Sequence, residues 1–254
     1  MALISCELFS ESLMRATTIT VILPQATEQQ IGLIDQPLDG PPPVLYLLHG
    51  LSDDHTAWQR YTSVERYAVA RGLAVVMPAV DRSFYANEAQ GHRYWDWVSE
   101  ELPRLVGQFF NVSQTPEDTF VAGLSMGGYG ALKHAFTHPE RYAAVATLSG
   151  VARIQALGDD LPRPEVVQRV FGGEITPADD VLALLEAAKG PLPKLYVGCG
   201  NGEELLLPQN QALVAAAEAK GMDVTVDFRP GTHEWTLWDA QIQDVIRWLP
   251  VRID

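Results

Sequence analysis

The stretch 121-VAGLSMGGYGAL-132 places Ser125 between two glycines, directly after an apolar run and directly before a helical pattern. Gly123 to Gly127 match the pattern G-x-S-x-G, which between a strand and a helix forms a sharp turn that exposes the serine hydroxyl. The glycines permit the strained backbone that such a turn needs. A turn that contains a serine by chance is the alternative, and other parts of the sequence are needed to choose between the two.

Strand-like and helix-like segments alternate along the chain. Six nearly continuous apolar runs that end in turn residues are typical of strands buried on both faces of a sheet. These runs are residues 44–50, 73–80, 119–125, 143–150, 194–200 and 224–231. Residues 17–24 alternate and are rich in β-branched side chains, which indicates an outer strand of antiparallel type.

Segments with helical spacing lie between these strands. They cover residues 57–72, 94–110, 125–139, 210–221 and 240–250, with a kink or restart expected at Pro103. Strands that alternate with helices predict an α/β fold whose mostly parallel sheet is covered on both faces. Functional residues are then expected at the carboxyl ends of the strands.

The length of the chain suits one large domain, so residues 1–254 are interpreted as a single α/β unit. Residues 151–190 differ from the rest, because two helical pieces there are separated by polar breaks. We expect this segment to be a small cap-like insertion over the site rather than a second domain.

The charge balance limits the partners of the protein. The chain has 18 Lys and Arg against 32 Asp and Glu, a net charge of −14, so neither nucleic acid nor an anionic membrane is an expected partner. No apolar run approaches the ~18 residues of a membrane span. Two cysteines and an amino terminus without a secretion signal favour the cytoplasm. The oligomeric state is left open, with a homo-oligomer among the options.

A catalytic serine needs a base, and the base needs a carboxylate that orients it. Of the six histidines, only His233 follows Ser125 in a turn after a predicted strand, so His233 is the predicted base. His134 and His138 lie four residues apart on the helix after the serine. A metal site with two imidazole ligands is one option for this pair, but a solvated helix face is favoured.

The acid is expected in the loop 201–210, which follows the predicted strand that ends at Gly200. This loop offers Glu203 and Glu204 but no aspartate, and side chains at adjacent positions cannot both point into one pocket. Either carboxylate could instead stabilise the start of a helix through the helix dipole. Asp227 in the last predicted strand is a further candidate, although it precedes the turn of the base awkwardly.

Two backbone amides are candidates for an oxyanion hole. The amide of Met126 lies at the amino end of a predicted helix, and that of Leu51 lies in the loop after an early strand. His49 in the same loop is interpreted as a side chain that organises the loop rather than as a second base. Asp53 and Asp54 have no third ligand at a fitting spacing, so they are attributed to turn chemistry and no metal is predicted.

Four segments carry a family resemblance: 47-LLHGLSDDHTAW-58, 123-GLSMGGYGAL-132, 198-GCGNGEELLLPQN-210 and 231-GTHEWTLW-238. They are similar to the esterase D and tributyrin-esterase branch of the α/β-hydrolase superfamily. Relatives in that branch include S-formylglutathione hydrolases, acetyl and feruloyl esterases, and mycolyltransferases. The resemblance extends from the hairpin at residues 10–24 to the last helix and includes 94-YWDWVSEELPRLV-106.

The resemblance implies a serine carboxylesterase of α/β-hydrolase fold. In this pattern Ser125 is the nucleophile, His233 is the base, and the amides of Leu51 and Met126 form the oxyanion hole. The implied reaction is hydrolysis of a small-molecule ester, with a short-chain, acetyl-like acyl group, through an acyl-enzyme. Such acyl transfer needs no metal or organic cofactor.

The family pattern usually has an aspartate as the acid, six residues before an asparagine. Glu204 and Asn210 keep that spacing, so the resemblance favours Glu204, with Glu203 as the alternative acid. Glutamate is one methylene longer than aspartate, so this position departs from the pattern and leaves the acid in doubt.

Aromatic residues near the predicted site either form the wall of the acyl pocket or belong to the core, and Trp95 and Trp235 are the chosen substrate-binding candidates. Two other functions stay open. One is an S-formylglutathione hydrolase-type thioesterase with the same triad. The other is a non-catalytic α/β-hydrolase-fold binding protein, to which the missing aspartate gives some weight, whereas the intact Ser125 and His233 count against it.

Overall fold

The computed structural model describes residues 1–27, 29, 31–32, 40–159 and 163–251. Residues 160–162 of the predicted insertion at 151–190 therefore lie outside the described residues. Among the helices of the described part, none is long and apolar enough to cross a bilayer.

An eight-stranded sheet runs through the molecule in the order β1-β2-β4-β3-β5-β6-β7-β8. Its strands are β1 (Ala2–Ser10), β2 (Arg15–Leu23), β3 (Val44–Leu48), β4 (Ala74–Pro78), β5 (Thr119–Leu124), β6 (Ala144–Leu148), β7 (Lys194–Gly200) and β8 (Val224–Arg229). Strands β3 to β8 pair in parallel, whereas β1 pairs antiparallel with β2, and β2 pairs antiparallel with β4. The predicted mostly parallel sheet is therefore confirmed.

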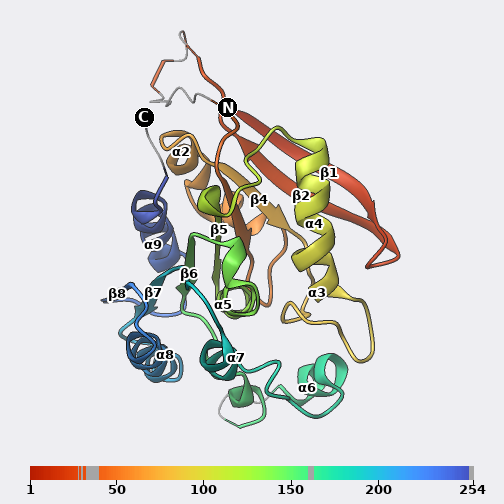
Figure 1. Cartoon of the computed structure of the whole chain (residues 1–254), viewed down its shortest axis with the longest axis vertical. Helices are drawn as coiled ribbons and strands as arrows, with labels where there is room; N and C mark the ends of the chain where they lie inside the picture. The colour runs from red at the N-terminus through yellow and green to blue at the C-terminus, as the bar shows by residue number, and fades with distance from the viewer. Residues whose placement is uncertain (28, 30, 33–39, 160–162, 252–254) are drawn as a thin grey trace.

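The two edges of the sheet differ from the sequence-based expectation. Figure 1 shows the β1–β2 hairpin along one side of the molecule and β8 at the other. Strand β1 lies outside the predicted strands, and it covers the outer side of β2. Strand β8 was expected to be buried on both faces, but it is half-buried and Val226 is 44% exposed, because an edge strand has a neighbour on one side only.

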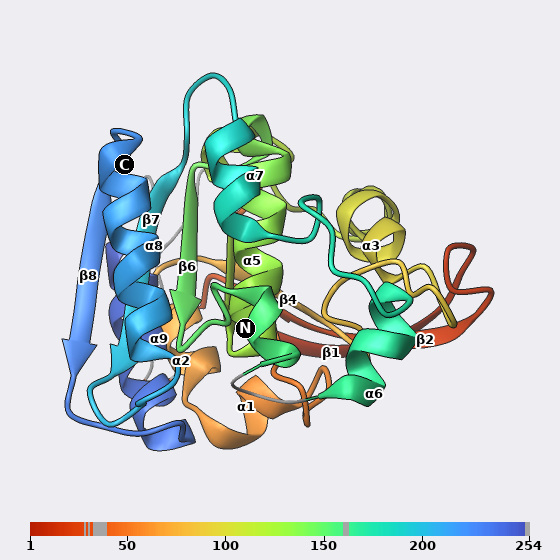
Figure 2. The same ribbon diagram turned by 90° about the horizontal axis from the view of Figure 1, so that it is seen from below.

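Helices cover both faces of the sheet (Figure 2). They are α1 (Ala57–Tyr61), α2 (Val64–Val69), α3 (Tyr94–Asp96), α4 (Leu102–Phe109), α5 (Met126–Thr137), α6 (Pro164–Phe171), α7 (Val181–Ala187), α8 (Leu207–Ala219) and α9 (Trp235–Trp248). Short turns of other helix types are the π-helical η1 (Trp97–Glu101) and the 3₁₀-helical η2 (Pro116–Asp118), η3 (Pro139–Arg141) and η4 (Ile154–Leu157). Apolar side chains of α4, α5, α7 and α8 form one core layer, and those of α1, α2 and α9 form the other.

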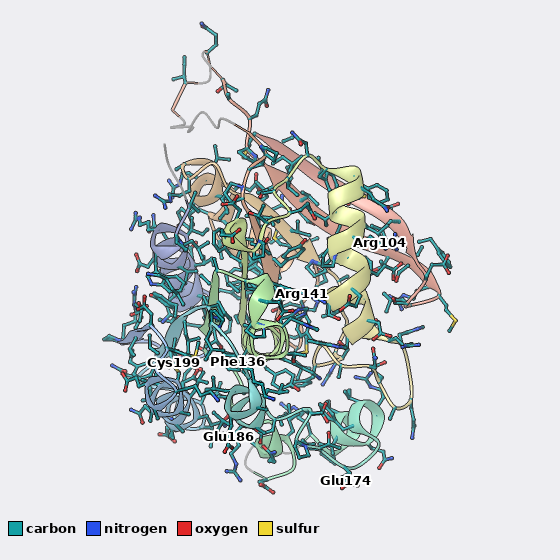
Figure 3. The ribbon with its side chains drawn as sticks, viewed as in Figure 1. Arg104, Phe136, Arg141, Glu174, Glu186 and Cys199 are labelled. Carbon is teal, nitrogen blue, oxygen red and sulfur yellow. The ribbon has the colours of Figure 1, made fainter. Side chains whose placement is uncertain are left out.

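Two predicted helices are interrupted for local reasons. The segment 57–72 divides into α1 and α2 because Thr62 is extended, with φ −135° and ψ 173°. The segment 94–110 contains the π-helical turn η1 just before Pro103. Proline has no N–H to bond the carbonyl four residues earlier, and the side chain of Arg141 (labelled in Figure 3) donates to that carbonyl, of Ser99, at 2.8 Å.

The described part of segment 151–190 contains η4, α6 and α7 and lies at one end of the molecule (Figure 1). Helix α7 packs against α5, and Lys133 of α5 forms a mostly buried ion pair with Asp179 at 3.3 Å. Glu174 and Glu186 of the segment, both labelled in Figure 3, are exposed. The segment is therefore attached to the sheet through α5, the helix that follows Ser125.

Candidate active site

Ser125 occupies a strained turn between β5 and α5. Its backbone has φ 53° and ψ −116°, and its amide donates to the Leu148 carbonyl at 2.9 Å. A Cβ added to Gly123 would lie 2.3 Å from the carbonyl oxygen of Gly127, and one added to Gly127 would lie 2.3 Å from that of Leu48. Neither position has room for a side chain, so the glycines of G-x-S-x-G allow the chain to turn this sharply.

A chain of hydrogen bonds starts at the Ser125 hydroxyl. The Oγ atom lies 3.1 Å from Nε2 of His233, and Nδ1 of His233 lies 2.7 Å from Oε2 of Glu203. The His233 side chain is 42% exposed, whereas that of Glu203 is 3% exposed. An imidazole between a hydroxyl and a carboxylate can take the hydroxyl proton while the carboxylate keeps its orientation. Ser125 and His233 thus meet as the sequence predicts.

The carboxylate of Glu203 is held on its other oxygen as well. Ser149 Oγ donates to Oε1 at 2.5 Å, and the amide of Gly200 donates to the same oxygen at 2.9 Å. The thiol of Cys199, labelled in Figure 3, lies 3.6 Å from it. Burial by itself raises the pKa of Glu203, but hydrogen bonds from His233, Ser149 and Gly200 outweigh it and hold the pKa below its usual range.

The structure corrects the preference for Glu204. Glu203 starts the turn that leads into α8, where its carbonyl accepts from the Leu207 amide, and its side chain points inward to His233. Glu204, one position later, is exposed at the cavity. The spacing to Asn210 does not report on the acid, because Asn210 Nδ2 instead donates to the Gly150 carbonyl at 2.9 Å.

The other candidate acid and Asp54, one of the two predicted turn aspartates, have separate partners. Asp227 pairs with Arg229 at 2.6 Å and accepts from the Tyr196 hydroxyl at 2.7 Å. Asp54 accepts from the amide and the hydroxyl of Thr56 at 2.8 and 2.6 Å, as expected of turn chemistry. Within the described ranges, no group of three or more His, Cys, Asp or Glu side chains could hold a metal ion.

Trp95 is not part of this site, which corrects its expected substrate-binding role. Its ring packs on those of His134 and His138, at centroid distances of 4.8 and 6.0 Å. The expected solvated helix face is also wrong for His134, which is buried and hydrogen-bonded to the Tyr142 hydroxyl at 3.1 Å. Helical spacing alone could not show that segment 94–110 covers this face of α5.

His49 organises the loop that carries one predicted oxyanion-hole amide. Its Nε2 atom accepts from the Val80 amide at 3.1 Å, so the ring proton is on Nδ1, which donates to the Gly50 carbonyl at 2.8 Å. That carbonyl and the Leu51 amide belong to one planar trans peptide and point in opposite directions. The bond to His49 therefore directs the Leu51 N–H away from His49, and Leu51 lines the same cavity as Ser125.

Met126 is the first residue of α5, so its amide belongs to the N–H groups at a helix start that lack a partner within the helix. It directly follows Ser125 in the chain. The Met126 amide thus lies at the start of the helix that follows Ser125, and the Leu51 amide lies on the loop after β3 that lines the same cavity. Their role as oxyanion-hole donors stays a prediction.

Ser125 and His233 open into a cavity of about 910 Å³. Its apolar lining residues are Leu51, Phe84, Leu124, Val151, Leu157, Leu205, Leu206, Trp235 and Trp238. Its acidic lining residues are Asp53, Glu203, Glu204 and Glu234, and its arginine is Arg163. Burial raises the pKa of Asp53. Val151, Leu157 and Arg163 come from segment 151–190, so the predicted insertion contributes one wall of this cavity.

Ser149 and Trp238 are the contacts that the sequence-based analysis missed. Ser149 stands at the end of the apolar run 143–150, so the rule that functional residues follow strand ends could have identified it. Trp238 ends the segment 231–238 that carries the family resemblance, but it was not chosen as a site residue. Its indole N–H donates to Ser149 Oγ at 3.0 Å.

Comparison with known proteins places these features in a family context. The model of the "Esterase" family, described as "Putative esterase", matches residues 10–249. An acetyl esterase of Caldicellulosiruptor saccharolyticus is 27% identical, with 98% of each chain covered. The structures of the fluorophosphonate-binding serine hydrolase FphF and of the S-formylglutathione hydrolase FrmB, both from Staphylococcus aureus, are each 35% identical. Each comparison covers 98% of this chain and 98% of the similar chain, and the TM-score is 0.87 for FphF and 0.84 for FrmB.

The two adjacent glutamates provide a matched pair of variants. Glu203→Gln should lower kcat for an activated acetyl ester on the order of 10⁴-fold, because the amide no longer holds the imidazole in the productive tautomer. Glu204→Gln should leave kcat within about threefold of the wild type, because its side chain does not contact His233. The reverse ranking in steady-state kinetics would assign the acid to Glu204.

Stability should fall in acid because His49 is buried in its neutral form. Burial lowers its pKa from 6.5 to about 4, so the unfolded chain binds this proton at a higher pH than the folded chain does. The contribution to the unfolding free energy is constant above pH 6.5 and declines as the pH falls from 6.5 to 4.

Urea unfolding of His49→Gln at several pH values measures this contribution. The loss of stability between pH 6.5 and 4 should be smaller in this variant than in the wild type. Ser5→Ala, at an exposed position without a titratable group, is the control, and its stability should fall between pH 6.5 and 4 as much as that of the wild type. If His49→Gln lost as much stability between pH 6.5 and 4 as the wild type does, His49 would protonate as easily in the folded chain as in the unfolded one.

Proposed function

Because this chain belongs to the esterase family and is a serine hydrolase of carboxylic esters, we propose that it acts on short-chain acyl esters through Ser125, His233 and Glu203. The observation that carries this proposal is the hydrogen-bond chain from the Ser125 hydroxyl to the Glu203 carboxylate, at a cavity large enough for a small ester. The non-catalytic binding protein considered from the sequence is not retained, because the family match is to esterases.

In the proposed first step, the Ser125 hydroxyl attacks the ester carbonyl while Nε2 of His233 takes the hydroxyl proton. The carboxylate of Glu203 stabilises the imidazolium that forms. The amides of Leu51 and Met126 are proposed to bind the developing oxyanion, for which one donor typically contributes roughly 100- to 1,000-fold in rate. His233 then protonates the leaving alcohol, and the acyl group stays on Ser125.

In the proposed second step, water replaces the alcohol. His233 takes a proton from the water as it attacks the acyl-enzyme, and the same amides bind the second oxyanion. Ser125 leaves with the proton from His233, which returns the enzyme to its starting state. The half-exposed position of the imidazole supports this step, because water can reach it.

The acyl group is proposed to be short because the curated relative is named an acetyl esterase. Trp235 lines the cavity and stays the predicted substrate-binding side chain on this chain. Its ring packs edge-on against Trp58 and Trp238, both at 5.3 Å, so it is held rigidly at the cavity wall. The cytoplasmic location expected from the sequence remains a prediction, and the oligomeric state stays open.

Ser125→Ala should lower kcat for p-nitrophenyl acetate by roughly 10⁶-fold, the usual loss for a missing nucleophile. A fluorophosphonate probe should label the wild type on the peptide that contains Ser125 and should not label this variant. Ser5→Ala, on an exposed position of β1, is the control and should keep full turnover and labelling. Ester turnover that survives in Ser125→Ala would disprove the assigned nucleophile.

A thioesterase acting on S-formylglutathione is the second candidate, since the structure of that name is 35% identical to this chain. The charge of the cavity favours a neutral ester instead. Asp53, Glu204 and Glu234 line it together with one arginine, Arg163, whereas glutathione conjugates carry a net negative charge.

The esterase and thioesterase functions predict different ratios of kcat/KM for an acetyl ester and for S-formylglutathione. We expect kcat/KM for a neutral acetyl ester to exceed that for S-formylglutathione, and the ratio to shrink as salt screens the cavity charges. The triple variant Asp53→Asn, Glu204→Gln, Glu234→Gln should also reduce the ratio. A higher kcat/KM for S-formylglutathione in the wild type would favour the thioesterase.

A further inference from the structure

Ser149 lies at the carboxyl end of β6, between the turn of Ser125 and the turn of Glu203. Its backbone has φ 48°, a conformation that few residues other than glycine adopt, and the residue is fully buried. The Ser149 amide still pairs with β7 through the Gly198 carbonyl at 2.8 Å. A buried serine with this backbone suggests that its hydroxyl is required at this place.

The direction of the Ser149 hydroxyl follows from its partners. An indole N–H can only donate, so Ser149 Oγ accepts from Trp238 Nε1 at 3.0 Å, and its own hydrogen is directed to Glu203 Oε1 at 2.5 Å. The Trp238 ring meets the His233 ring edge-on, with a centroid distance of 4.7 Å and an interplanar angle of 88°. His233, Glu203, Ser149 and Trp238 therefore form a closed ring of contacts.

The residues on either side of Ser149 hold the nucleophile turn. The Leu148 carbonyl accepts from the Ser125 amide at 2.9 Å, and the Val151 amide donates to the Ser125 carbonyl at 3.4 Å. Asn210 of α8 donates to the intervening Gly150 carbonyl at 2.9 Å. One short segment thus connects the backbone of the serine to the side chain of the acid.

A glutamate acid has a particular need for such a contact. Its side chain has one more rotatable bond than that of aspartate, so more conformations compete with the one that reaches His233. With Oε1 of Glu203 held by Ser149 and by the Gly200 amide, Oε2 is directed to Nδ1 of His233. The opposite ring nitrogen is then directed to the Ser125 hydroxyl.

We propose that Ser149 is a positioning residue, which holds the Glu203 carboxylate against His233 and is itself held by the indole N–H of Trp238. This inference rests on the proposed function, because it gives Ser149 a task in the reaction of Ser125. Ser149 is not among the residues that line the cavity, so it acts through Glu203 and not on the substrate.

Ser149→Gly removes the hydroxyl and keeps the positive φ without strain. We expect kcat for p-nitrophenyl acetate to fall roughly 10- to 100-fold, the loss typical of a displaced catalytic group, with KM within about twofold of the wild type. In a Glu203→Gln background the same change should have no further effect on the rate of fluorophosphonate labelling, because the carboxylate that Ser149 positions is absent.

Trp238→Phe removes the indole N–H and keeps an aromatic ring near His233, and it tests the proposal should Ser149→Gly fail to fold. It should lower kcat in the wild-type background and have no further effect beside Glu203→Gln. Thr147→Val is the matched control: Thr147 Oγ1 is buried in the same strand without a described hydrogen-bond partner, so kcat should not change. Thermal unfolding midpoints of all variants separate a loss of folding from a loss of rate.

Two outcomes would overturn the positioning role. One is a kcat for folded Ser149→Gly within twofold of the wild type. The other is an equal loss of labelling rate with and without Glu203→Gln, which would show that Ser149 acts independently of the acid. Failure of the proposed function is a separate result, since it would appear as ester turnover in Ser125→Ala whatever Ser149→Gly does.

Discussion

The positive φ of Ser125 is the constraint on which the active site depends. A non-glycine residue in this conformation costs about 1–3 kcal/mol, so the surrounding structure must hold it in place. The buried strand β5 holds one end of the turn and the buried helix α5 holds the other, while Gly123 and Gly127 leave room for the two to approach. The hydroxyl is exposed to the cavity because the chain reverses direction within one residue.

The parallel sheet brings the remaining groups to this turn. The loops after β3, β6, β7 and β8 all leave the same edge of the sheet, since parallel strands share the direction of their carboxyl ends. They carry His49, Ser149, Glu203 and His233 respectively, which are far apart in the sequence. Each group reaches the site from a rigid strand end, which favours a fixed geometry over a flexible one.

Sequence patterns were sufficient where the function of a residue depends on its immediate neighbours. Ser125 was identified because the glycines needed for a sharp turn flank it, and His233 because it alone among the histidines follows the serine after a predicted strand. Patterns failed where a side chain's direction decides the role. Glu203 and Glu204 have the same chemistry and adjacent positions, and only the path of the turn before α8 directs Glu203 to the imidazole.

The sequence by itself determined the alternation of strands and helices, the turn at Ser125 and the pairing of a serine with a histidine, because these depend on local backbone preferences and on periodicity. Tertiary structure alone decided that Trp95 packs against α5, that Glu203 is the carboxylate on His233, and that Ser149 joins Glu203 to Trp238. Such contacts depend on which faces of separate strands and helices meet. That is set by packing across the whole sheet, and no short segment of sequence contains it.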